Sequence, residues 1–175
     1  MSTPCPICGF DGRQVSPSDA AVALRSFPRR FKMVLAHPDD ADRPDDVLHR
    51  RPKSGGLSAI EHAAWVATGI GAVADAFQAV SIHDDPVISL PPVDVDPPVA
   101  GGEDSVDAAL ARIQTATSAL ATAVEGTPGD SWLRHGHTDG ESVTALEVVT
   151  TAVHLGVHHL RLADRVINEV ARERD

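Results

Sequence analysis

Apolar positions recur at spacings of three and four residues in four segments of the chain, a pattern typical of amphipathic helices. The first segment covers about residues 18–37 and is interrupted by Pro28, which is expected to kink or restart the helix because proline has no amide donor. The other three cover about 58–80, 106–124 and 144–171. No segment shows a convincing strand pattern.

Residues suited to helix ends mark the boundaries of these segments. Ser58 followed by Glu61, and Thr144 followed by Glu147, are capping boxes in which hydroxyl and carboxylate groups satisfy free amides at a helix start. Gly126 closes the third segment. The sequence therefore predicts an all-α protein, a four-helix up-down bundle.

The connections between these helices are long. Residues 38–56 are rich in charge and glycine, and we expect a loop with at most a short helical turn. Residues 81–104 contain five prolines, which predicts a long crossover loop that acts as a lid or a strap. Residues 1–15 form a short cysteine-containing tail, and residues 16–175 form the bundle domain.

Composition narrows the class of protein. Aromatic residues make up 3% of the 175, with no Tyr, which favours helices packed through Ala, Val and Leu. The formal charge of −10 argues against binding to nucleic acid or to an anionic membrane. We find no apolar run near the ~18 residues that cross a bilayer and no signal peptide, so a cytoplasmic protein is expected.

Two histidines of the last helix can converge on one metal ion. His154 and His158 lie four residues apart, within about 40° of each other around the helix, on a polar stripe. Neutral imidazoles are good ligands for zinc or nickel. The alternative is a solvated helix face. His159 points into the apolar arc, and we expect it to be a packed imidazole.

A third ligand is sought on the second helix. Glu61 and Trp65 share one face of that helix with small residues, a composition that suits the wall of a pocket. His62 lies about 100° away from Glu61. Trp65 is interpreted either as part of such a pocket or as a core or interface aromatic.

The motif CPICG, with Cys5 and Cys8, is one half of a zinc ribbon, and the chain has no other cysteine. The pair can be a redox dithiol, an unliganded pair, half of a four-thiolate site shared by two chains, or part of a mixed site. The histidines that would complete a mixed site are His135 with His137, His37 with His49, or, if the tail folds over the bundle, His154 with His158.

The segments LSAIEHAAWVATGI and VTALEVVTTAVHLGVHHLRLADRV resemble the DinB-like four-helix bundles, which include mycothiol-dependent maleylpyruvate isomerases and bacillithiol transferases. The segments CPICGFDG and SPSDAAVALRSFPRRF resemble an actinobacterial branch of that superfamily. The resemblance spans roughly residues 4–168.

The resemblance implies a divalent metal held by one histidine of the second helix and by an H-x-x-x-H pair, here His154 and His158. The expected second-helix position is Trp65, so either His62 substitutes or the site is degenerate. Where the branch carries an acidic residue after the first histidine of the pair, this chain has Leu155.

Two functions follow from these patterns. The first is a thiol-dependent S-transferase, isomerase or hydrolase acting on a small molecule. In this hypothesis His154, His158 and His62 hold a metal that ionises a cofactor thiol such as mycothiol. Arg161 or Arg165 would then bind a carboxylate, or merely place charge near the helix end. The second function is a non-enzymatic binding or homodimerisation module.

Overall fold

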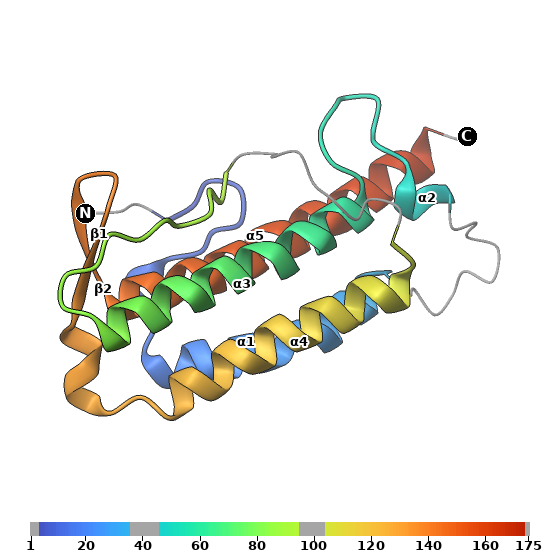
Figure 1. Cartoon of the computed structure of the whole chain (residues 1–175). Helices are drawn as coiled ribbons and strands as arrows, with labels where there is room; N and C mark the ends of the chain where they lie inside the picture. The colour runs from blue at the N-terminus through green and yellow to red at the C-terminus, as the bar shows by residue number, and fades with distance from the viewer. Residues whose placement is uncertain (1–3, 36–45, 95–103, 174–175) are drawn as a thin grey trace.

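The computed structural model describes residues 4–35, 46–94 and 104–173 (Figure 1). Most of them lie in four long helices, so the predicted all-α, four-helix bundle class is confirmed. The long helices are α1 (Pro17–Leu35), α3 (Ala59–Ile82), α4 (Val106–Glu125) and α5 (Ala145–Arg172).

The helices form a square in which α1 and α3 occupy opposite corners. Each of them packs against both α4 and α5. The colour sequence in Figure 1 shows that α3 and α4 run in the same direction, and so do α1 and α5. A parallel pair of consecutive helices needs a connection that returns along the whole bundle, which explains the long segment between α3 and α4.

Helix starts match the capping residues seen in the sequence. Ser58 and Glu61 form the capping box of α3, and Thr144 and Glu147 form that of α5. Pro28, in contrast, lies inside a continuous α1. The packing of buried Phe27 and Phe31 on either side of it outweighs one missing backbone hydrogen bond.

A two-stranded antiparallel hairpin was not expected. It consists of β1 (His135–Thr138) and β2 (Glu141–Thr144). Asp139 and Gly140 join the strands with φ angles of 51° and 82°. An Asp-Gly pair is a strong signal for a tight hairpin turn, so the sequence did contain a clue to it.

The segment after α3 crosses the hairpin as a strap. Val87 bridges His137, and the amide of Ile88 donates to the His137 carbonyl at 2.8 Å. This supports the strap interpretation for the part of 81–104 that ends at Asp94. The short helix α2 (Asp46–His49) and the 3-10 turns Gly12–Gln14 and Gly129–Leu133 complete the fold.

Helix α3 is long and apolar enough to span a bilayer by length and composition alone. Its apolar side chains, however, pack against α4 and α5 inside the bundle. Burial in this core accounts for the composition of α3.

The start of α3 is fixed by an ion pair between the buried Glu61 carboxylate and the exposed Arg51, in addition to the hydrogen bond that Glu61 accepts from the Ser58 amide at 2.8 Å. Burial by itself would raise the pKa of Glu61, but the hydrogen bonds from Arg51 and Ser58 outweigh it and lower that pKa. An acid with a lowered folded-state pKa stabilises the fold above its ordinary value and loses that contribution as the pH falls through the folded value.

Glu61→Gln is therefore expected to lower the free energy of unfolding by about 1–2 kcal/mol at pH 7. The difference from the wild type should shrink as the pH is lowered below about 4.3, the usual glutamate pKa. Urea unfolding at several pH values measures both effects. Glu125→Gln, which breaks an exposed pair with Arg25, is the matched control and should cost less than about 1 kcal/mol at every pH. Equal losses in the two variants would contradict this role of Glu61.

Candidate metal centre

The N-terminal tail folds into a compact knuckle around its two cysteines. The Gly9 amide donates to the Cys5 carbonyl at 2.7 Å, and the Cys5 amide donates to the Phe10 carbonyl at 2.9 Å. Gly9 adopts a φ of 69°, a conformation that suits glycine and closes the turn. The knuckle places Cys5 and Cys8 on one side of the loop, and both are buried free thiols.

Two contacts seat this knuckle on α5. The Phe10 ring stacks on the His154 ring with centroids 4.8 Å apart and an interplanar angle of 12°. At Gly12 the tail comes so close to α5 that an added Cβ would lie 2.8 Å from Cγ2 of Thr150. The tail is thus packed against the helix that carries the histidine pair.

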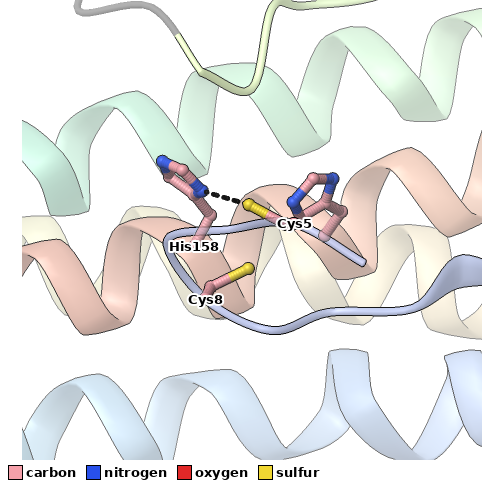
Figure 2. A group of neighbouring side chains, drawn as sticks. Cys5, Cys8 and His158 are labelled. Atoms are coloured by element: carbon pink, nitrogen blue, oxygen red, sulfur yellow. Dashed lines mark hydrogen bonds between the residues drawn. The ribbon is translucent and has the colours of Figure 1, made fainter. Parts of the chain in front are cut away.

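The docked tail brings two sulfur and two nitrogen donors together. One ligand atom from each of Cys5, Cys8, His154 and His158 lies within 4.8 Å of the other three. Cys5 Sγ is 3.6 Å from His158 Nδ1, the contact marked in Figure 2. Among the alternatives for the cysteines, this is the arrangement in which the tail folds over the bundle.

The donors are shielded from solvent to different degrees. His158 and Cys8 are almost fully buried, Cys5 is 8% exposed, and His154 is half-buried. Burial and the nearby His158 lower the pKa of His154, against the opposing effect of Asp94. Burial raises the pKa of the Cys8 thiol. Without a bound cation, these pKa shifts favour the neutral imidazole of His154 and the protonated thiol of Cys8.

A pocket of about 710 Å³ adjoins the donor group. Its walls come from the tail, from the first turns of α5 and from the end of the strap at Asp94. Cys5 and His154 form part of these walls. A small molecule in this pocket would lie against two of the four donors.

His62 takes a different partner. Its Nδ1 lies 2.9 Å from Nδ1 of His159, so α3 and α5 share a buried imidazole pair. His159 is fully buried, as its position on the apolar arc predicts, and burial together with His62 lowers its pKa to about 3. The structure does not bring His62 into the four-donor group.

The remaining residues considered from the sequence lie outside the donor group. Trp65 is half-buried against the core, and its Nε1 is buried without a hydrogen-bond partner among the residues that the structure describes. Arg161 and Arg165 are exposed on α5. The other candidate histidines are His135 and His137 in β1, His49, whose Nε2 lies 3.0 Å from the Asp104 carbonyl, and His37, which lies outside the described ranges.

Two residues of the site were missed from the sequence. Phe10 orients His154 by stacking, and Asp94 Oδ1 lies 3.6 Å from His158 Nδ1. Phe10 directly follows the CPICG motif, which was a usable signal. Asp94 lies in a proline-rich segment where nothing in the local pattern distinguishes it from neighbouring acidic residues.

Comparison with known proteins adds one finding on the fold. No family model matches the sequence, and no curated protein matches it. A solved structure does match: "YfiT from Bacillus subtilis is a probable metal-dependent hydrolase with an unusual four-helix bundle topology". The TM-score is 0.71 over 98% of this chain and 97% of that one, at 14% sequence identity. The two chains share a fold.

Proposed function

We propose that the protein binds one divalent metal ion, zinc foremost, through Cys5, Cys8, His154 and His158. The observation that carries this proposal is the convergence of four donor atoms within 4.8 Å of one another. They come from two segments about 150 residues apart in the sequence. Burying polar groups costs free energy unless they are paired or bound to a metal, and a shared ion would compensate all four donors.

The spacing of the donors suits a tetrahedral ion. Zn–S distances near 2.3 Å and Zn–N distances near 2.0–2.1 Å place neighbouring S and N ligands about 3.5 Å apart. The Cys5 Sγ to His158 Nδ1 distance is 3.6 Å. His154 Nε2 is buried and has no hydrogen-bond partner in the described part of the chain. A buried polar atom needs a partner, and a metal ion bound to this nitrogen would supply one.

Such an ion would fasten the tail to α5. Two thiolates and two imidazoles fill a tetrahedral zinc shell, the arrangement typical of structural sites. The bound cation would keep both cysteines ionised although burial favours the thiols. Because Cys5 and His154 also line the pocket, the bound metal ion would hold two of the pocket's walls together.

A second candidate function is metal-dependent catalysis on a small molecule in the pocket. The adjoining pocket and the fold shared with YfiT, described as a probable metal-dependent hydrolase, favour it. The resemblance to DinB-like proteins extends the candidate to thiol-dependent S-transfer or isomerisation with a cofactor such as mycothiol. The alternative of a degenerate, non-enzymatic module rests on Trp65, yet the four-donor group does not need a ligand at position 65.

Elemental analysis of the purified chain should find one zinc or other divalent ion per molecule. His158→Ala is expected to reduce the stoichiometry below about 0.1, because a loss of one of four ligands leaves an incomplete shell. Trp65→His, which restores the position expected from the resemblance, should leave the stoichiometry at one.

The matched control is His135→Ala, which removes an exposed histidine of the hairpin. It should keep the metal. A wild-type chain without metal that acquires one ion only after Trp65→His would refute the four-donor site and support the degenerate one. Circular dichroism of each variant distinguishes metal loss from unfolding.

A further inference from the structure

The four donors differ in their access to the pocket. Cys5 and His154 form part of its wall, whereas Cys8 and His158 are 2% and 1% exposed and are not part of the lining. A molecule in the pocket can therefore contact Cys5, which is 8% exposed, while Cys8 is covered by the protein. The two cysteines are chemically alike but unequal in position.

A carboxylate lies next to the same group of donors. Asp94 Oδ1 is 3.6 Å from His158 Nδ1, and that nitrogen is also 3.6 Å from Cys5 Sγ. Asp94 lines the same pocket as Cys5, and its side chain is 65% exposed. Carboxylate oxygen is itself a good zinc ligand, at about 2.0–2.2 Å. Asp94 is thus a reserve donor on the open side of the group.

We propose that Cys5 is the reactive ligand of this centre, attacking soft alkyl electrophiles that enter the pocket, and that Asp94 replaces it on the metal. This inference rests on the proposed metal centre. The ligand class is a small molecule with a saturated carbon that carries a leaving group. Cys8, His154 and His158 remain bound to the metal throughout.

The step balances without a further reactant. The Cys5 thiolate donates an electron pair to carbon and forms an S–C bond, and the leaving group departs with the electrons of the bond that breaks. The product is a neutral thioether, a much weaker ligand than a thiolate. Asp94 then binds in its place, so a donor with one negative charge replaces another and the net charge of the ligand set is unchanged.

Iodoacetamide is the probe, applied to the metal-loaded, full-length protein at less than one equivalent. Peptide mass spectrometry should find Cys5 modified at least about tenfold faster than Cys8. After removal of free metal, the modified wild type should retain its ion. Modified Asp94→Asn should bind it about 10- to 100-fold more weakly, the size of effect expected when a group supporting a metal site is removed.

Asp75→Asn, on the exposed side of α3, is the matched control and should behave like the wild type. Cobalt substitution gives a second readout, because the thiolate-to-metal absorption should fall by about half on modification of Cys5. Affinity measurements on Cys5→Ser and on Cys5→Ser with Asp94→Asn test the replacement without any labelling. Asp94→Asn should reduce the metal affinity at least about tenfold more in the Cys5→Ser background than in the unlabelled wild type.

The outcomes separate this inference from the metal site itself. Unlabelled wild type without metal would overturn both. A wild type that holds one ion through the four donors, but whose two cysteines react at equal rates, would overturn only the reactive role of Cys5. If labelled Asp94→Asn retained its metal to the same extent as labelled Asp75→Asn, the role of Asp94 would be overturned.

Discussion

Replacing Cys5 and Cys8 together with serine is expected to abolish the stabilisation of the protein by zinc. The pair supplies both negatively charged donors, and serine hydroxyls are poor zinc ligands. A ligand present at a thousandfold excess over its Kd stabilises the folded state by about 4 kcal/mol. For a chain of this size that corresponds to roughly 8–16 °C in Tm, from about 2–4 °C per kcal/mol.

Thermal unfolding with zinc and with a chelator measures this effect. The wild type should show the full Tm difference between the two conditions, and the double variant should show none. Limited proteolysis should in addition cut the tail of the double variant, because the tail then loses its metal link to α5 and is held by packing contacts such as those of Phe10 and Gly12.

The control for these experiments is Ile7→Ser, which changes an exposed residue between the two cysteines and leaves every donor in place. It should keep the zinc-dependent Tm shift. A zinc-dependent shift in the double cysteine variant as large as that of Ile7→Ser would show that the tail does not hold the ion.

The sequence predicts the helices well because their signals are local. The capping boxes at Ser58 and Thr144 give the starts of α3 and α5, and helical periodicity gives their extents to within about two residues. Two errors have physical causes. Pro28 does not interrupt α1, since buried neighbours hold the helix together, and the hairpin strands are too short for an alternating pattern.

The candidate site was only partly predictable. The spacing of His154 and His158 is a local signal, and it pointed to a shared ligand. The partner of the cysteines depends on how the tail docks, which is decided by contacts such as that of Gly12 with Thr150, far apart in the sequence. The sequence alone therefore leaves several completions of the cysteine site open.

The case of His62 illustrates the same limit. Helical periodicity could place it on α3 but could not identify the residue opposite it on α5. The structure gives His159 as its partner, at 2.9 Å. A buried polar side chain needs a partner, but periodicity along a single helix does not indicate which one.

Phe27→Ala is expected to lower the free energy of unfolding by about 3–5 kcal/mol, the usual cost of removing a buried aromatic ring. The Phe27 ring is fully buried and fills the space beside Gly156 of α5. Gly156 lies between His154 and His158 in the sequence but on the opposite side of the helix, at about 200° from His154. The ring thus supports the back of the helical turn that carries the histidine pair.

The same contact predicts that two substitutions will not be additive. A Cβ at Gly156 would lie 2.3 Å from Cζ of Phe27, so Gly156→Ala should cost about 1–3 kcal/mol through overpacking. In the Phe27→Ala background the ring is gone, and the better helix propensity of alanine, worth about 1 kcal/mol, should make Gly156→Ala neutral or stabilising.

Urea unfolding of the single and double variants measures the coupling, and Gly71→Ala is the control. Position 71 has open space for a Cβ, so alanine there should stabilise α3 in both backgrounds. If Gly156→Ala were equally harmful with and without the Phe27 ring, the close approach of α1 to α5 could not be its cause. If Gly156→Ala destabilised the wild type but not the Phe27→Ala variant, while Gly71→Ala stabilised both, the contact of Gly156 with Phe27 would be shown to set the distance between α1 and the turn of α5 that carries the histidine pair.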